Sequence, residues 1–195
     1  MARQRRPNGA LPEPVPDMKL PAFVLLAALA APVAHSAVLD ASPSGFTLEN
    51  SEVVLVDADR AWEALVGEVD RWWPRDHTWW GSEGTLSIEP KAGGCFCEID
   101  DTGRRQARHL EVLFVDPGRT LRMGGGLGPL QGLGLQGALE FRLAPEASGG
   151  TRITLWYRVG GYSPDDLSAF APVVDRVQGM QLAALAAHLR AGGEG

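Results

Sequence analysis

The stretch GALEFRLAPEASGGTRITLWYRV, residues 137–159, decides the fold that the sequence predicts. Apolar and polar residues alternate through 137–145 and again through 151–159, which is typical of strands whose two faces meet different surroundings. The intervening residues, EASGG, are turn formers. The sequence therefore predicts an antiparallel hairpin, with Leu139 and Tyr157 on its core face.

Similar signals extend in both directions from this hairpin. A first strand is predicted at 46–56, and helical spacing follows the candidate N-cap Asp57, buries Trp62 and ends where Pro74 stops the helix. Other short segments of strand character predict the rest of a meander of about six strands, at 85–90, 95–100, 107–115 and 119–123.

The last part of the chain is predicted to be helical. Ser163, Pro164 and two aspartates form a helix start, and residues 167–190 continue it with a break at Pro172. One face of the long segment carries Val174, Val177, Gln181, Leu185 and His188. We therefore expect an α+β fold in which a curved antiparallel sheet surrounds a long C-terminal helix and leaves a cavity beside it.

Length and charge limit the function classes. The 195 residues suggest one domain, and the net charge of −6 comes with no basic patch beyond the N-terminus. Nucleic acid is therefore excluded as an expected partner.

The N-terminal residues predict export. Residues 18–37 place a lysine, an apolar run and small residues in the order of a secretory signal peptide; a disordered tail with an apolar patch is the alternative. We expect an extension and signal peptide at 1–36, a linker at 37–45, the domain at 46–190 and a tail at 191–195. The apolar run is too short to span a membrane, and no lipid-anchor cysteine follows it. A periplasmic or secreted protein without a stable membrane anchor is predicted.

The two cysteines, Cys95 and Cys97, are predicted to be free thiols. Alternate residues of a strand have β-carbons about 6.5–7 Å apart, whereas a disulfide needs about 3.5–4.5 Å. A metal site is the alternative, but only His77, His109 and His188 remain as partners after cleavage. No metal and no cofactor are expected.

Several segments together resemble a known superfamily. They are FTLENSEVVLVDADRAWEALV (46–66), GTLSIEPKAGGCFCE (84–98), EVLFVDPGRTLRM (111–123), GTRITLWYRVGGY (150–162) and VDRVQGMQL (174–182). In their order and spacing the chain is similar to the SRPBCC, or START-like, superfamily, nearest to the branch of polyketide cyclases and homologues of the Hsp90 ATPase activator.

That resemblance implies a helix-grip fold with a deep apolar cavity between the sheet and the C-terminal helix. It also implies binding of lipids, hormones or aromatic polyketides, with cyclisation or hydrolysis in some members. The superfamily has no universal catalytic motif, so no catalytic residue is transferred. The predicted export argues against chaperone work with intracellular Hsp90.

The segment RWWPRDHTWW, residues 71–80, holds four of the six tryptophans. Trp72 and Trp73 are expected to cap the core. Trp79 and Trp80 are expected either at a cavity rim or in a solvated loop with His77, because tryptophan suits a partly wet pocket mouth.

A glycine-rich segment, residues 123–137, carries almost no charge and no phosphate-binding motif. It predicts an apolar flap whose leucines, Leu127 and Leu130 among them, pack on the cavity mouth or on a second copy of the protein. The Tyr157 hydroxyl is expected either to contact a ligand or to bond to the backbone.

The sequence thus predicts binding of a small hydrophobic or aromatic ligand. The expected ligand-binding residues are His77, Trp79, Trp80, Leu127, Leu130, Tyr157 and Gln181. The alternatives are a cyclase- or hydrolase-type enzyme that uses His77, Glu98 or Tyr157, and a protein-interaction module that self-associates through the flap. Glu98 and Glu111 are expected on neighbouring strands with their side chains at the surface.

Overall fold

The computed structural model describes residues 35–192, which form strands, α-helices and short 3₁₀ helices (η). Their order is β1 (His35–Ser42), β2 (Gly45–Val54), α1 (Ala58–Gly67), α2 (Val69–Trp72), η1 (Arg75–His77), η2 (Gly81–Glu83), β3 (Gly84–Ile88), β4 (Cys95–Asp100), β5 (Gln106–Asp116), β6 (Thr120–Gly124), α3 (Pro129–Gly132), β7 (Gln136–Pro145), β8 (Thr151–Gly160), η3 (Leu167–Ala169) and α4 (Ala171–Gly192).

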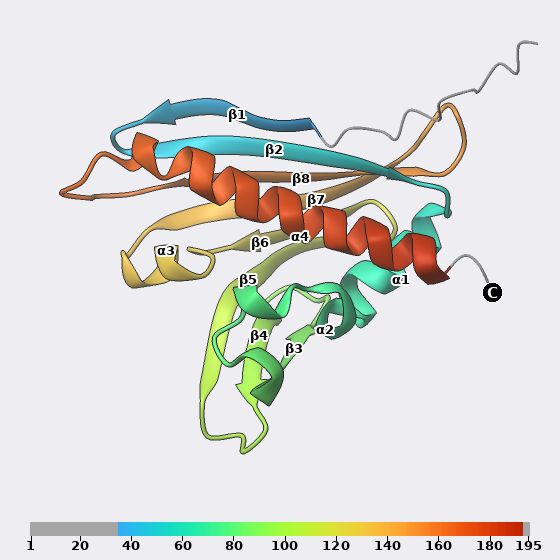
Figure 1. Cartoon of the computed structure of the whole chain (residues 1–195), viewed down its shortest axis with the longest axis horizontal. Coiled ribbons are helices and arrows are strands. Elements are labelled where there is room, and N and C mark those ends of the chain that lie inside the picture. The colour runs from blue at the N-terminus through green and yellow to red at the C-terminus, as the bar shows by residue number, and fades with distance from the viewer. Residues whose placement is uncertain (1–34, 193–195) are drawn as a thin grey trace, which may run out of the picture. The chain divides into compact units, whose positions relative to one another are not determined.

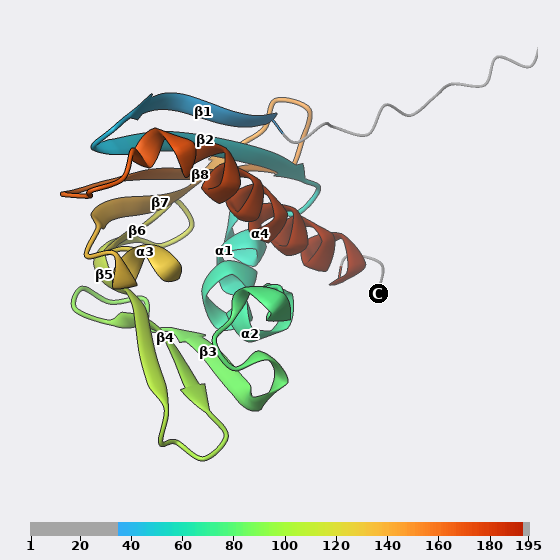
Figure 2. The same cartoon turned by 60° about the vertical axis from the view of Figure 1, so that its left-hand side comes forward.

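The described strands form one sheet in the order β1-β2-β8-β7-β6-β5-β4-β3, and every neighbouring pair is antiparallel. The predicted hairpin is confirmed as β7 and β8, with Leu139 opposite Tyr157 and both side chains buried. The sheet curves, and the helices α1, α2 and α4 lie on its concave side (Figures 1 and 2). This is the predicted α+β helix-grip arrangement.

The helix after β2 is broken in two. Asp57 caps α1 as predicted, since its side chain accepts a hydrogen bond of 2.8 Å from the backbone N–H of Arg60. The chain departs from helical geometry at Glu68 before α2 begins. Trp62 is only half-buried, in contrast to the expectation, because the face that meets the core is formed by Ala61, Ala64 and Leu65 instead.

The long helix α4 packs mainly on β2 and β1. The predicted break is confirmed: the short η3 precedes it, and Pro172 stands in its first turn, where a missing backbone N–H costs nothing. The residue that caps the N-terminus of η3 is Asp166 rather than Ser163. The Asp166 side chain accepts a 2.9 Å hydrogen bond from the Ser168 N–H. Within residues 35–192 no helix is long and apolar enough to cross a membrane.

The N-terminal boundary differs from the expected one. Residues 35–42, within and just before the predicted linker at 37–45, form β1 and pair with β2, so that Ala41 lies opposite Phe46. The Ser42 hydroxyl donates to the Gly45 carbonyl and closes the turn between these strands. Most of the predicted extension and signal peptide, residues 1–34, lies outside the described residues, as do residues 193–195 of the predicted tail.

The prediction of free thiols is wrong, because Cys95 and Cys97 form a disulfide. The sequence argument assumed a regular strand, but the β4–β5 ladder shifts register between Phe96 and Cys97. At this irregularity the Cα atoms of the two cysteines lie 5.4 Å apart, within the usual range for a disulfide. The two cysteines are therefore closer together than alternate residues of a regular strand would be.

Acid is expected to remove a stabilising cluster that joins α1 to α4. Glu68 accepts hydrogen bonds from Arg60 and from His188, and these two groups, Arg60 foremost, lower its pKa to about 2. Its contribution to stability is therefore complete above its ordinary pKa and is lost as pH falls towards about 2. Glu68→Gln should lower the free energy of unfolding by about 1 kcal/mol at neutral pH, after allowance for screening by water.

Urea unfolding of both proteins at neutral pH and near pH 3 measures this effect. The difference between wild type and variant should shrink in acid, because near pH 3 Glu68 is protonated in the unfolded chain and folding must then release that proton. An equal difference at both pH values would contradict the assignment.

Candidate functional site

A pocket of about 470 Å³ lies beside the first half of α4. Four parts of the chain line it: the tryptophan loop (residues 73–79), His109 of β5, residues 127–133 of the flap and the helix face between Phe170 and Gln181. Its walls are mostly aromatic and aliphatic, and its volume falls in the range of small-molecule sites. Among the lining residues only His109 belongs to a strand.

The pocket brings five of the seven predicted residues together. These are His77, Trp79, Leu127, Leu130 and Gln181. Trp79 is 49% exposed and stands at the opening, whereas Gln181 is buried on α4. The other two, Trp80 and Tyr157, are not among the lining residues.

Tyr157 is fully buried under the flap. Its hydroxyl donates to the Gly125 carbonyl and accepts from the Leu127 N–H, both at 3.1 Å, and burial raises its pKa to about 12. Of the two sequence expectations, the bond to the backbone is therefore the one observed. Tyr157 positions Leu127, which lines the pocket, and the single O–H donor of Tyr157 is used by the backbone.

The flap packs largely on its own chain. Leu130 and Leu135 are buried and Leu127 is half-buried, while Leu133 is exposed at the pocket. Leu127, Leu130 and Leu133 line the pocket, which agrees with the expected packing at a pocket mouth. Self-association stays a prediction.

Trp72 and Trp73 are both buried, as expected. The Trp72 indole N–H donates to the Ala64 carbonyl at 2.9 Å, and that of Trp73 donates to the His77 carbonyl at 3.0 Å. Trp73 also contributes to the pocket wall, so its ring serves both the core and the site.

A buried carboxylate behind the tryptophan loop was not expected from the sequence. Glu98 is completely buried, so its predicted surface position is wrong, whereas Glu111 is partly exposed and pairs with Arg108. One oxygen of Glu98 accepts the backbone N–H of Trp80 at 2.9 Å, and the other accepts that of Trp79 at 2.9 Å. The carboxylate thus fixes the backbone of the loop.

The second Glu98 oxygen also lies 3.0 Å from Nε2 of His109. His109 occupies the bulge of β5: Phe96 pairs with Leu110 and Cys97 with Arg108, which leaves His109 without an opposite residue. His109 and Leu110 are consequently both buried although they are adjacent in a strand. The bulge therefore turns His109 towards the pocket side.

The imidazole of His109 is neutral near pH 7. Burial lowers its pKa, and this outweighs the opposite effect of Glu98. Because each Glu98 oxygen already accepts a backbone N–H, the carboxylate acts as acceptor and Nε2–H of His109 donates to it. Nδ1 is then an acceptor, and within the described residues it has no hydrogen-bond partner.

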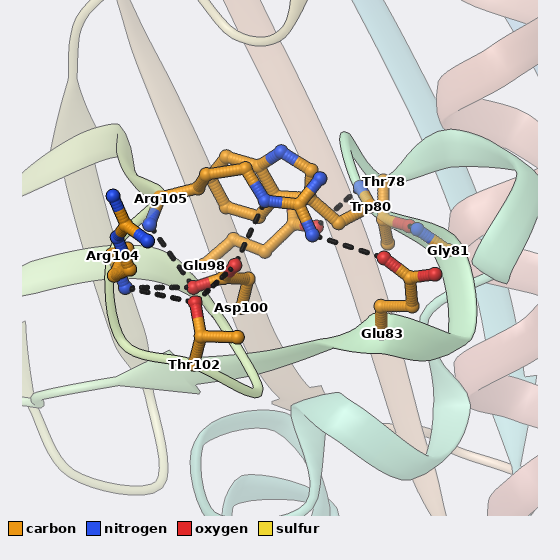
Figure 3. Close-up of polar contacts among 9 residues, drawn as sticks. All are labelled: Thr78, Trp80, Gly81, Glu83, Glu98, Asp100, Thr102, Arg104 and Arg105. Atoms are coloured by element: carbon orange, nitrogen blue, oxygen red, sulfur yellow. Dashed lines mark hydrogen bonds and ion pairs between the residues drawn. The ribbon is translucent and has the colours of Figure 1, made fainter.

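A second buried acid holds the hairpin next to the tryptophan loop (Figure 3). Asp100 accepts hydrogen bonds from the Arg105 side chain at 2.8 Å, from the backbone of Arg104 and Arg105, and from Thr102. The Arg105 guanidinium holds the pKa of Asp100 well below its usual range. Arg105 also forms an ion pair with Glu83, and its guanidinium carbon lies 5.6 Å from the Trp80 ring centre. Trp80 is therefore held in place by contacts next to the pocket and does not line it.

The pocket contains buried amides without partners. Gln178 is 1% exposed and lacks a partner for both of its amide atoms, and Oε1 of Gln181 also has none. Buried polar groups are normally satisfied, so each of these atoms needs an explanation.

The site shows binding chemistry more clearly than bond-breaking chemistry. Its polar groups are the glutamine amides, His109, and the side chains at the opening, Asp76, His77 and Thr78. Within residues 35–192 no cluster of three or more histidine, cysteine or acidic side chains is placed to hold a metal ion.

Another hollow, of about 450 Å³, lies where β1, β2, β7 and β8 meet, and is more open. Six of its thirteen lining residues are glycine, serine or threonine. Trp156 and Arg158 also line it, and the Arg158 guanidinium lies 5.5 Å from the Trp156 ring centre. It offers few apolar side chains to enclose a ligand.

No protein-family model matches the sequence, and no curated protein matches it. Solved structures are similar. A protein of unknown function from Staphylococcus aureus has a TM-score of 0.58 at 11% identity, over 77% of this chain and 97% of that one. A protein from Rhodobacter sphaeroides has a TM-score of 0.53 at 18% identity, over 80% and 97%. CalU16 from Micromonospora echinospora has a TM-score of 0.52 at 15% identity, over 80% and 84%.

At these identities the likeness concerns the fold. A curved antiparallel sheet with a long C-terminal helix on its concave side is common to the chain and its structural neighbours. The chain therefore adopts the helix-grip, START-like α+β fold.

Proposed function

We propose that this chain binds a small hydrophobic or aromatic ligand in the pocket beside α4, as a periplasmic or secreted protein. The observation that carries the proposal is the pocket itself: about 470 Å³, walled by aromatic and aliphatic side chains, with buried glutamine amides that lack partners. The START-like fold is consistent with such a role.

Export has its own support. The order of residues in 18–37 is that of a signal peptide. The disulfide between Cys95 and Cys97 fits an oxidising compartment. Fractionation of cells that produce the full chain, followed by mass spectrometry of the N-terminus, tests this part; an intact N-terminus in the cytoplasm would refute it.

Blocking the pocket should abolish binding. Val177 lines the pocket from α4, and Val177→Trp adds a ring where the ligand would lie. Met180 is exposed on the same helix and does not line the pocket, so Met180→Trp is a matched control. With N-phenyl-1-naphthylamine as a fluorescent probe, we expect Val177→Trp to weaken binding at least about tenfold.

Met180→Trp should bind the probe as the wild type does. Organic extraction of purified wild-type protein, followed by mass spectrometry, should also release a small apolar molecule that the Val177→Trp protein lacks. Equal probe binding by the two variants, or no binding by the wild type, would contradict a ligand site here.

An enzyme acting on such a ligand is the second candidate. It is favoured by one observation, the hydrogen bond between Glu98 and His109, which orients a ring whose other nitrogen is unoccupied. Tyr157 loses its expected part, since the backbone uses its hydroxyl. Incubation of the extracted ligand with wild type and with His109→Phe separates the candidates, because only an enzyme would convert it and lose that conversion in the variant.

A further inference from the structure

The unpartnered polar atoms of the pocket are mainly acceptors. Gln178 and Gln181 lie three residues apart on α4 and both line the pocket. Their unpartnered atoms are two carbonyl oxygens and one amide nitrogen, that of Gln178. These atoms have almost no accessible surface, so a bound molecule reaches them only once the amide groups rotate towards the pocket. A buried polar atom without a partner costs about 1 to 3 kcal/mol, and a ligand that satisfied the rotated amides would gain that energy.

His109, which also lines the pocket, supplies a third acceptor. Glu98 takes the Nε2–H bond, and this fixes the tautomer in which Nδ1 carries a lone pair. The ring also lies against Phe96, with 5.0 Å between ring centres, so its orientation is held from two sides. A group that meets Nδ1 must therefore donate a proton to the hydrogen bond.

The charge of the lining residues restricts the ligand further. No lysine or arginine is among them, and their one acidic side chain, Asp76, is exposed. An anionic group inside the pocket would lose its hydration and meet no cation in return. The site therefore disfavours carboxylates and phosphates.

We propose that the pocket selects an uncharged ligand that carries at least one hydroxyl group on an apolar body. The hydroxyl donates to Nδ1 of His109, and any further polar group pairs with Gln178 or Gln181 after their amides rotate towards the pocket. This inference rests on the proposed function and adds to it the hydrogen-bonding pattern of the ligand. Glu98 is a positioning residue in this scheme, because it acts only through His109.

Three naphthalene probes test the selection. 2-Naphthol donates a hydrogen bond, 2-methoxynaphthalene has the same rings without the donor, and 2-naphthoate is an anion. Calorimetric titration of the wild-type protein at neutral pH should show 2-naphthol binding at least about tenfold more tightly than 2-methoxynaphthalene, because the ether leaves the acceptors unsatisfied. 2-Naphthoate should bind more weakly than 2-naphthol.

His109→Phe removes the acceptor and keeps a ring in its place. In this variant the affinities for 2-naphthol and 2-methoxynaphthalene should become equal, a change in preference that a merely structural role would not produce. Gln178→Leu provides a second variant of similar size, which removes two unpartnered atoms and is not expected to impair folding. This variant should still bind 2-naphthol more tightly than 2-methoxynaphthalene, because the single hydroxyl of 2-naphthol donates to His109.

The outcomes distinguish this inference from the proposed function. If none of the three probes binds, the ligand site itself is refuted. If all three bind with equal affinity, the site stands and the selection for a hydroxyl donor is refuted. Tighter binding of 2-naphthoate than of 2-naphthol would also overturn the selection, since it would show that the pocket favours an anion.

Discussion

Replacing Glu98 with alanine is expected to lower the free energy of unfolding by about 3 to 5 kcal/mol, because each buried donor left without an acceptor costs about 1 to 3 kcal/mol. The substitution leaves the backbone N–H groups of Trp79 and Trp80 and the Nε2–H of His109 without their acceptor. It also opens a void beneath the tryptophan loop, because the Glu98 side chain is completely buried. Urea unfolding followed by tryptophan fluorescence measures the loss.

Glu111→Ala is the matched control for this prediction. Glu111 lies on the neighbouring strand, its side chain is 44% exposed, and its ion pair with Arg108 is at the surface. Its loss should cost less than about 1 kcal/mol. Similar costs for the two variants would show that Glu98 does not hold the loop as described. Probe binding should weaken in the Glu98 variant alone, because Trp79 lines the pocket.

Replacing Tyr157 with alanine should destabilise the protein by about 3 to 5 kcal/mol, the range for truncating a buried aromatic residue. The ring is at the centre of the core formed by β7 and β8, and its hydroxyl joins β8 to the flap through Gly125 and Leu127. Tyr157→Phe keeps the ring and removes the two hydrogen bonds, so it should cost about 1 to 3 kcal/mol.

Hydrogen exchange separates the two effects of Tyr157. The amide of Leu127 should exchange faster in Tyr157→Phe than in wild type, because the hydroxyl is its acceptor. Tyr162, the other tyrosine of the chain, is 90% exposed, and Tyr162→Phe should change neither stability nor exchange. Unchanged exchange at Leu127 in the Tyr157 variant would refute the link between β8 and the flap.

The regular parts of the fold follow from local patterns in the sequence. Alternation of apolar residues predicts β7 and β8 with the correct inward faces, because both strands keep an unbroken period of two. The cap at Asp57 and the break at Pro172 were also predictable, since each depends on the local backbone alone. β1 is not predicted from the sequence, because its residues carry no clear alternation of apolar and polar side chains.

Of the two buried polar residues behind the tryptophan loop, the sequence pattern could have indicated the inward position of Glu98 but not that of His109. Glu98 shares a face of β4 with Phe96, and that alternation could have indicated an inward carboxylate. The position of His109 depends on the bulge, which moves one residue out of the period and is determined by strand pairing between distant segments. The spacing of Cys95 and Cys97 predicted free thiols and gave the wrong result because it assumed the Cα separation of a regular strand, whereas these Cα atoms are 5.4 Å apart.

The separation between the sheet and the pocket wall has a consequence for how such proteins diversify. Apart from His109, the lining side chains come from loops, from the flap and from one end of α4, whereas the strands hold the core. Substitutions in the loops, the flap and this end of α4 can change the shape of the pocket while the strand register stays the same. This fold is therefore suited to acquire new ligand preferences through substitutions that leave the sheet unchanged.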